Sequence, residues 1–403
     1  MTKGGRTTSI HWIVIVLVIS IGGFLLTRKN EPPPSPTPKP NPRSDLTLAQ
    51  LGNPPDWSQL ERFQETISRD TFQHRLETIY TKTDGWKKWI TVTDTEATLK
   101  TSGAPFALRF ATSDKPAPGA IWDWKSRSDL LPSRNLPLEG LLIAIDPGHI
   151  GGKFAQIEER YLKYGDAPAI EEGAMTLRTA KYLKPLLEEL GASVTLTRTK
   201  EEPVTPLRAK NFPDPKLFYR TAEIRARAGL INQKIKPDLV VCLHYNASGS
   251  PFPTAGQHFH VILPGAFHES ELAHDDERFE MLQRLLAGNI EEEIPLATSI
   301  AAAFKDHTDL PPYTYRTNHQ FSTNLNSNPY LWARNLLATR LYQCPVVFLE
   351  PYVMNSTDFI ERIKAGDYEG IKFIDGKSRR SVYREYAHAV ADGLARHYTS
   401  IHD

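Results

Sequence analysis

The sequence predicts an α/β fold in which a mainly parallel sheet is flanked by helices on both faces. From residue 139 onward, short β-branched runs alternate with longer stretches of helical periodicity, as they do in βαβ units. The runs LLIAID, LVVCLH and PVVFLE are apolar up to their last residue, which is typical of strands buried on both faces.

The elements of this part of the chain are expected in a regular order. Strands are expected at 140–146, 192–198, 237–244, 257–264 and 345–351, and helices at 175–191, 220–233, 296–306, 329–340 and 380–398. Gly191 closes the first of these helices, as glycine often does at a helix C-terminus. Pro329 stands in the first turn of the fourth, where proline is tolerated.

Composition divides the 403 residues into four parts. Residues 1–29 contain an apolar segment, and residues 30–44 form a proline-rich linker that favours an extended polyproline II spacer. Residues 45–135 combine a helical pattern with two alternating runs, which predicts a small accessory α+β region of unknown role. Residues 136–403 are expected to form the large α/β domain.

The apolar segment IHWIVIVLVISIGGFLL covers residues 10–26. As a helix it would extend ~25 Å, at the short end for a membrane span. A small-x-small trio at 20–22 resembles a signal cleavage site, but the apolar run continues beyond it, so we expect an uncleaved membrane anchor. A cleaved signal peptide with a secreted domain is the alternative. Basic residues flank both ends and leave the orientation open; we place the long C-terminal part outside the cytoplasm.

Charge and cysteine usage exclude two classes of protein. The 48 Lys and Arg residues nearly balance the 47 Asp and Glu residues, so there is no basic footprint for nucleic acid. Cys242 and Cys344 are the two cysteines, too few for a disulfide framework or a cysteine-based zinc site. Each lies in an apolar run, which favours buried free thiols, with a single bridge as the alternative.

Three expected strands end on residues that can bind a metal or transfer a proton. LLIAID leads through a Pro-Gly corner into His149, LVVCLH ends on His244, and PVVFLE ends on Glu350. The acidic pair Glu171 and Glu172 stands just before the helix expected at 175–191. Ligands of open α/β sheets bind beyond the carboxyl ends of the strands, so we expect these side chains to meet there.

Two imidazoles and one carboxylate, with a position left for water, are the ligands of a catalytic zinc site. Zinc lowers the pKa of bound water from about 15.7 toward 7, and a carboxylate that does not bind the metal can then relay the proton. Each residue alone has a structural alternative: a turn for His149, a core position for His244 and a helix cap for Glu350. Their order and positions together favour the metal site.

Residues 139–400 resemble the zinc-dependent N-acetylmuramoyl-L-alanine amidases, which cleave the amide between muramic acid and the stem peptide of peptidoglycan. The resemblance depends on the motifs IAIDPGHIGG, EGAMTLRTAKYLKPLLEELGASVTLTR, RAGLINQKIKPDLVVCLHYNA and RLYQCPVVFLEPYVMN. It implies that residues 136–403 form a catalytic domain with Zn²⁺ as cofactor and peptidoglycan as substrate. An activating partner protein is left open.

The resemblance assigns roles to individual positions. It implies that His149, Glu172 and His244 bind zinc and that Glu350 is the catalytic residue. Glu172 is preferred to Glu171 because the family's ligand stands five residues before a helix leucine, here Leu177. Asn246 matches the family's His-x-Asn-Ala asparagine and is expected to support the site or bind substrate, with a turn-forming role as the alternative.

Some positions depart from the family pattern. Gly173 stands where the family commonly has lysine, the charged segment KFAQIEERYLKYGDAPA replaces a glycine-rich loop, and EPYVMN replaces a Leu-Gly-Phe type sequence.

The acidic insertion at 268–293 is interpreted as a solvated surface excursion, with an inhibitory helix over the zinc as the alternative. His258 and His260 alternate on one strand and are expected to be exposed, with a position lining the cleft as the alternative. They are not counted as ligands.

Two rival functions remain open at this stage. One is another zinc hydrolase of the cell wall, a peptidase or deacetylase, which would use the same ligands and release a different product. The other is a wall-binding regulator with a vestigial site, which would not hold stoichiometric zinc.

Overall fold

The computed structural model describes residues 54–114, 123–130, 136–208, 212, 215–250, 252–316, 319–374 and 376–399. The helices are α1 (Arg69–Arg75), α2 (Glu172–Glu189), α3 (Pro215–Leu230), α4 (Glu269–Leu272), α5 (Asp275–Ala287), α6 (Ile290–Thr308), α7 (Leu337–Leu341), α8 (Thr357–Lys364) and α9 (Val382–Thr399). Short helical turns are η2 (Trp57–Phe63), η3 (Leu76–Tyr80), η4 (Asp84–Lys88), η5 (Arg127–Asp129), η6 (Gly152–Phe154) and η8 (Ile231–Ile235).

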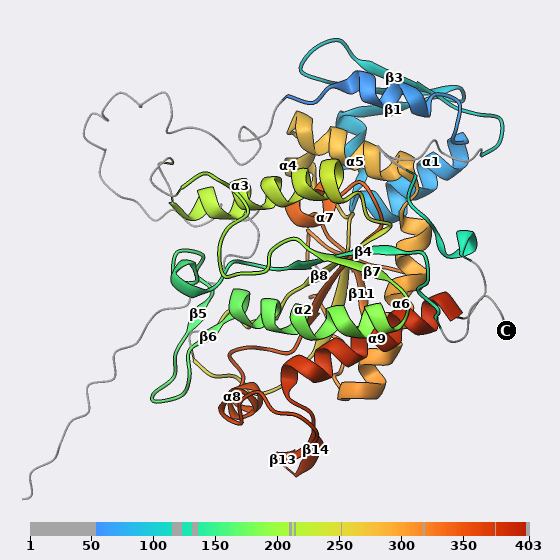
Figure 1. Cartoon of the computed structure of the whole chain (residues 1–403). Coiled ribbons are helices and arrows are strands. Elements are labelled where there is room, and N and C mark those ends of the chain that lie inside the picture. Colours follow the sequence, from blue (N-terminus) through green and yellow to red (C-terminus); the bar gives the residue numbers. More distant parts are fainter. Residues whose placement is uncertain are drawn as a thin grey trace, which may run out of the picture.

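Within the described residues, the strands form one large sheet and three small ones (Figure 1). The large sheet has the order β10 (Thr323–Asn324), β11 (Leu331–Ala333), β9 (Phe259–Leu263), β12 (Val346–Pro351), β8 (Leu239–Leu243), β4 (Leu142–Pro147) and β7 (Ser193–Leu196). The small sheets are β1 (Ile90–Val92), β2 (Glu96–Leu99) and β3 (Phe106–Arg109); β5 (Tyr161–Leu162) with β6 (Ile170–Glu171); and β13 (Lys372–Ile374) with β14 (Lys377–Arg379).

The large sheet is mainly parallel, which confirms the predicted α/β fold. Strands β12, β8, β4 and β7 are parallel neighbours, and β11 is parallel to β9. The β9–β12 and β10–β11 pairs are antiparallel. Because β4, β8 and β12 run in the same direction, their carboxyl ends meet at one edge of the sheet, where His149, His244 and Glu350 follow or end them.

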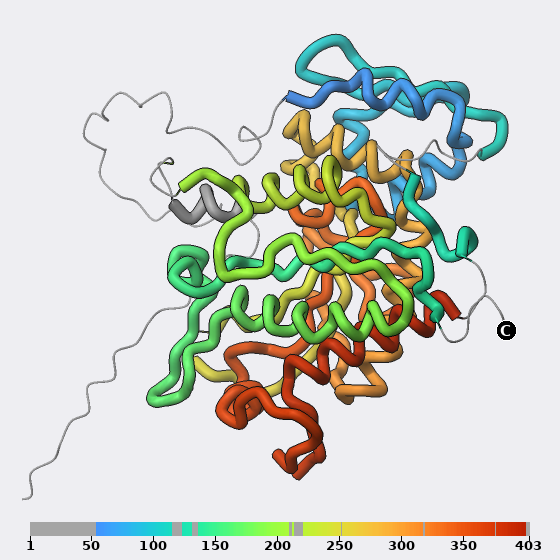
Figure 2. Tube along the Cα trace, viewed as in Figure 1, coloured from blue at the N-terminus to red at the C-terminus, as the bar shows by residue number. Residues whose placement is uncertain are grey.

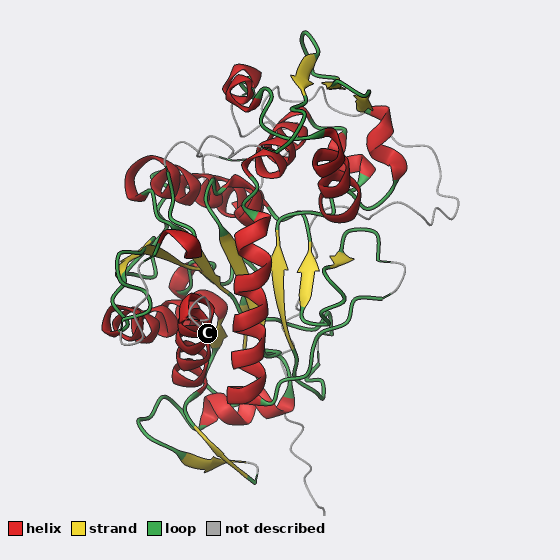
Figure 3. Cartoon of the chain, turned by 90° about the vertical axis from the view of Figure 1, so that its right-hand side faces the viewer, coloured by secondary structure: helices red, strands yellow, loops and turns green. Residues whose placement is uncertain are grey.

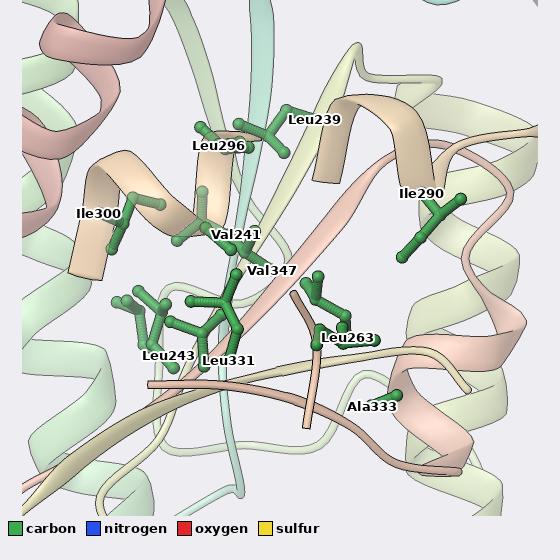
Figure 4. Close-up of a cluster of buried hydrophobic side chains, with 14 of the residues drawn as sticks. Leu239, Val241, Leu243, Leu263, Ile290, Leu296, Ile300, Leu331, Ala333 and Val347 are labelled. Carbon is green, nitrogen blue, oxygen red and sulfur yellow. The ribbon is translucent and has the colours of Figure 1, made fainter. Parts of the chain in front are cut away.

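Alternate residues of the strands supply two apolar layers. One layer packs against α2, α6 and α9, and Figure 4 shows part of it, including Val241, Val347, Leu296 and Ile300. Figure 3 shows α6 as a long helix running alongside strands of the large sheet. The opposite layer packs against α3, η8 and α7; its members include Cys242, Phe348, Ala228 and Ile231. Helices therefore cover both faces of the sheet.

Side-chain caps fix several helix starts. The hydroxyl of Ser68 accepts from the backbone N–H of Thr71 at the start of α1, and Ser356 does the same for Phe359 at the start of α8. Each cap satisfies a backbone donor that has no partner within the helix. These hydroxyls therefore set where the two helices begin.

Residues 57–110 do not stand apart from the α/β sheet in the described structure. Their buried side chains, among them Leu60, Phe63, Phe72 and Leu76, belong to the same apolar cluster as the sheet and α5. Figure 2 shows this segment, coloured blue to cyan, lying beside the yellow-orange α5. The division of the chain at 135/136 stays a prediction, but the described residues on its two sides share one core.

The insertion at 268–293 is not a solvated surface excursion, so that interpretation was wrong. Within α5, ten of the thirteen residues are buried. The Arg284 guanidinium donates to the carbonyls of Tyr342 and Cys344, which precede β12 at the end of the sheet opposite the site. Trp57 packs edge-on against Phe279 at 5.5 Å. The helix joins the accessory region to the sheet and does not cover the expected metal ligands.

Other expectations are corrected or left open by the structure. The helix expected at 329–340 is instead β11 followed by the short α7, because Leu331–Ala333 pairs with β9. Both cysteines are buried and free, in agreement with their apolar surroundings. Among the described residues, no helix combines the length and apolar content needed to cross a bilayer. The apolar segment at 10–26 and the linker at 30–44 lie outside the described residues.

Deleting residues 54–114 should destabilise the whole protein. Their removal uncovers several large apolar side chains of the common cluster, and each is worth about 1.5–3 kcal/mol when buried. That loss is comparable with the total stability of about 5–15 kcal/mol that domains have. We expect the deletion variant to aggregate or to melt well below the intact chain in calorimetry. A fragment 136–403 that melts at the temperature of the intact chain would contradict this expectation.

Candidate metal centre

The three residues expected to bind a metal lie together beyond the carboxyl ends of β4 and β8. One ligand atom each from His149, Glu172 and His244 lies within 4.8 Å of the other two. Glu172 is the first residue of α2, so a helix start brings its carboxylate to the strand ends. One carboxylate oxygen is 3.2 Å from Nε2 of His149, and the other is 3.0 Å from Nδ1 of His244.

The spacing and chemistry of these atoms fit a tetrahedral zinc site. Zinc bonds to nitrogen and oxygen are about 2.0–2.2 Å long, so ligand atoms of a tetrahedral site lie about 3.3–3.5 Å apart. The separations of the two imidazoles from Glu172, 3.2 and 3.0 Å, are near that value, although each is measured from a different oxygen of the carboxylate. Burial lowers the pKa of His149 well below its ordinary value, which keeps the imidazole neutral, as a ligand must be. Burial alone would raise the pKa of Glu172, but His149 and His244 lower it to about 2.

A buried arginine holds the backbone of the Pro-Gly corner. His149 has a positive φ of 56°, a conformation that a non-glycine residue keeps only when its surroundings enforce it. Arg227, from α3, donates to the carbonyls of His149 at 2.6 Å and Pro147 at 2.7 Å. Its charge is balanced by Asp146 at 3.0 Å and Glu223 at 2.9 Å. This network therefore holds the backbone of His149 in the conformation that directs its side chain toward Glu172.

A second buried arginine ties the corner to the start of α2. Arg198, which follows β7, donates to the carbonyls of Pro147, Gly148 and Gly173. The Thr176 hydroxyl also donates to Gly148 at 2.6 Å. These bonds fix the helix that carries Glu172 relative to the strand that carries His149.

The glycine at 173 has a steric reason. A Cβ atom at this position would lie 2.2 Å from the backbone nitrogen of Gly151. The loop after His149 therefore passes too close to α2 for any side chain at 173. This explains why the chain departs from the family's lysine there.

Gly148 has to be glycine because a side chain there would clash with the ring of His244. A Cβ atom here would lie 2.3 Å from Cε1 and Nε2 of His244. His244 is held by Glu172 and by stacking on Phe348 at 4.0 Å, so it cannot move without losing both contacts. We expect Gly148→Ala to lower zinc affinity by about tenfold or more, as measured by competition with a chelator.

The control for this variant is Gly229→Ala in α3, where nothing lies within 4 Å of the added atom. Alanine in a helix is favoured over glycine by about 1 kcal/mol, so this protein should bind zinc normally and be no less stable. Equal zinc affinity in the two variants would contradict the steric argument.

The two candidate acids before α2 have different partners. The Glu171 carboxylate accepts from the backbone N–H of Gly152 at 2.8 Å, which turns it away from the cluster. Glu172 is 3% exposed and additionally accepts from the backbone N–H of Tyr245 at 3.2 Å. This arrangement favours Glu172 over Glu171 as the ligand.

The charged segment after His149 contributes two residues that sequence reasoning did not find. Glu158 accepts from the backbone N–H of Ile150 at 2.9 Å and lies 3.5 Å from Nδ1 of His149. Arg160 Nε lies 3.3 Å from the carboxylate oxygen of Glu172 that faces His149. A carboxylate behind a metal-binding histidine orients its ring. The only sequence signal for these residues was the unusual charge of the segment.

Glu350 lies at the same edge of the sheet but outside the cluster. Leu349 pairs with Leu243, which puts Glu350 next to His244 on the neighbouring strand. Burial raises the pKa of Glu350 to about 7, His244 acts against that rise, and the carboxylate of Glu172 adds to it. No hydrogen bond from a described residue reaches its carboxylate. A carboxyl with this pKa can both take and give a proton near neutral pH.

Asn246 follows His244 and turns its side chain toward His258. Its amide nitrogen is 2.9 Å from Nε2 of His258, and its amide oxygen accepts from the backbone N–H of Ala247. The expectation that the two strand histidines are exposed was wrong: His260 is 2% exposed and His258 is partly buried. Neither joins the metal cluster found among the described residues.

Comparison with known proteins finds one family for this part of the chain. A family model described as N-acetylmuramoyl-L-alanine amidase matches residues 143–372, more than half of the chain. The germination-specific N-acetylmuramoyl-L-alanine amidase of Bacillus subtilis is 29% identical over 146 residues, which are 36% of this chain and 54% of that protein. The probable cell wall amidase LytH of Staphylococcus saprophyticus is 31% identical over 101 residues, 24% of this chain and 33% of that protein.

The matched segments thus span about half of one curated relative and a third of the other. Among solved structures, the amidase Ami1 of Mycobacterium abscessus aligns with 64% of this chain and 99% of its own, at 19% identity and a TM-score of 0.39.

Proposed function

Because this chain belongs to the N-acetylmuramoyl-L-alanine amidase family, we propose that it hydrolyses the amide between N-acetylmuramic acid and L-alanine in peptidoglycan. The observation that carries this proposal is the meeting of His149, Glu172 and His244 at one point, with Glu350 beside them at the carboxyl edge of the sheet. The arrangement provides a metal-binding set and a separate proton carrier. Hydrolysis of an unactivated amide needs both.

We assign Zn²⁺ to His149, Glu172 and His244. Two nitrogen donors and one carboxylate match the zinc sites of hydrolases that keep one position open. When bound there, zinc supplies Lewis acidity toward the substrate carbonyl and lowers the pKa of water. Glu158 and Arg227 support the assignment. Glu158 contacts the ring nitrogen of His149 that does not face Glu172, and Arg227 donates to the His149 carbonyl.

Glu350 is assigned the proton transfer. Its carboxylate takes a proton from the attacking water and gives it to the nitrogen of the departing L-alanine. Its burial and raised pKa suit a group that changes protonation state twice in each cycle. Asn246 is assigned a supporting role. Its side chain contacts His258, which precedes β9 near the carboxyl ends of β8 and β12.

The substrate places the reaction outside the cytoplasm, at the cell wall. We propose that the apolar segment at 10–26 anchors the chain in the membrane and that the linker at 30–44 holds the enzyme away from the bilayer. A cleaved signal peptide would give a secreted enzyme with the same chemistry. Mass determination of the mature protein from membrane and soluble fractions distinguishes the two.

The activity is tested by digesting purified sacculi with the whole chain and analysing the products by mass spectrometry. The whole chain is needed because residues 57–110 share the core of the sheet. An amidase releases stem peptides with a free L-alanine amine and leaves the glycan strands intact. Release of shorter peptides or of acetate would favour a peptidase or a deacetylase, and zinc far below one ion per chain would favour a vestigial site.

A further inference from the structure

A second histidine lies beside Glu350, on the side away from the metal cluster. In the antiparallel β9–β12 pair, Glu350 is the direct partner of His260. Directly paired residues project from the same face of a sheet, with Cβ atoms about 4.5–5.5 Å apart. Glu350 therefore lies between His244, which directly follows β8, and His260 on β9.

His260 is held by a tyrosine and an arginine from neighbouring segments. Its Nε2 atom is 3.2 Å from the hydroxyl of Tyr315, and the same hydroxyl is 3.4 Å from Nη1 of Arg334. The Tyr315 ring stands edge-on to the imidazole at 5.5 Å, and Tyr313 packs on it at 4.9 Å. The imidazole is thus fixed in one orientation.

The hydrogen bonds around His260 are compatible with a ring hydrogen on Nδ1. Burial lowers the pKa of His260 well below its ordinary value, so the ring is neutral and carries a single N–H. Arg334 is placed to donate to the Tyr315 oxygen, which leaves the phenol hydrogen available for Nε2 of His260. In this arrangement Nε2 accepts and the ring hydrogen is on Nδ1, which is the tautomer that the proposal below requires.

The Nδ1 atom of His260 is buried and has no hydrogen-bond partner among the described residues, so as an N–H group it would be a donor without an acceptor. A buried donor without a partner is unfavourable, and such groups often mark a functional role. The carboxylate of Glu350, on the directly paired residue, likewise receives no hydrogen bond from a described residue. A buried ring nitrogen without a partner among the described residues therefore lies on the residue paired directly with Glu350.

We propose that His260 is the positioning residue of Glu350. Its Nδ1–H donates to one carboxylate oxygen of Glu350 in the working enzyme, so that the other oxygen is directed toward the metal cluster and the scissile amide. Tyr315 and Arg334 keep the imidazole in the tautomer that can donate. The inference rests on the proposed function. It adds to that function three residues linked by hydrogen bonds, His260, Tyr315 and Arg334, that position the carboxylate of Glu350.

The kinetic test uses the whole zinc-loaded chain and two variants of His260. His260→Leu removes the donor, and His260→Asn keeps an amide N–H close to the place of Nδ1. We expect His260→Leu to lower kcat by about tenfold or more with little change in KM and with one zinc per chain, and His260→Asn to recover most of the loss. The matched control is His307→Leu, which removes a histidine bonded to Asp392 and should leave kcat unchanged.

The tautomer is tested without activity, by ¹⁵N NMR of histidine-labelled protein prepared free of metal. The wild-type spectrum should show His260 as the Nδ1–H form, and Tyr315→Phe should move hydrogen to Nε2. A normal kcat in His260→Leu, a loss of zinc in that variant, a failure of asparagine to restore turnover, or an Nε2–H form in the wild type would each overturn the proposal. Absence of amide cleavage by the wild type would instead overturn the proposed function, and the NMR result would still stand.

Discussion

Glu350→Gln should bind one zinc ion per chain and lose turnover by roughly 10²- to 10⁴-fold, the usual contribution of a positioned proton carrier. Glutamine has nearly the same shape, so it preserves the packing of β12 but cannot take a proton from water. The residue is outside the cluster formed by His149, Glu172 and His244, which is why zinc should remain. Metal content by mass spectrometry and kcat on sacculi measure the two effects separately.

The control for this variant is Glu361→Gln, on α8. That residue is exposed and pairs with Lys364, so the same chemical change should leave kcat unchanged. A Glu350→Gln enzyme with near-normal turnover would remove Glu350 from the mechanism. A variant without zinc would instead make Glu350 part of the metal site.

The sheet and the cluster were predictable because they depend on local patterns. Continuous apolar runs indicate buried parallel strands, and parallel strands bring their carboxyl ends to one edge whatever the loops between them do. His244 and Glu350 each end such a run, so their convergence required only the order of the strands. To predict the position of His149, one also had to assume that the Pro-Gly turn keeps the chain near the carboxyl ends of the strands.

The parts that were missed depend on contacts between distant segments. The sequence showed that the segment forming α5 is charged but could not show that its charged side chains are buried. The partners of Arg284 and Arg278 come from the segment before β12 and from residues 57–110. His260 looked exposed because the short β11, which covers its edge of the sheet, was expected to be a helix. Arg227 and Glu158, which contact His149, belong to no sequence motif that would have identified them.

His149→Ala and His244→Ala should each lose the metal and, with it, all detectable amide cleavage. Removing one of three protein ligands leaves two, too few for the sites that catalytic zinc occupies in proteins. Zinc should also stabilise the wild type, because a ligand that binds only the folded state raises the melting temperature by mass action. We expect added zinc to raise Tm in the wild type and in a control variant, His307→Ala, which removes a histidine bonded to Asp392. Added zinc should leave Tm unchanged in the two ligand variants.

The same experiment separates a ligand from a residue that merely supports the fold. If His149 only held the corner, its alanine variant would melt lower yet still gain stability from zinc. If it binds the ion, the response to zinc disappears even where the metal-free proteins melt at similar temperatures. Stoichiometric zinc in either ligand variant would show that the atoms meeting beyond β4 and β8 are a hydrogen-bonded cluster and that the catalytic metal, if any, is bound elsewhere.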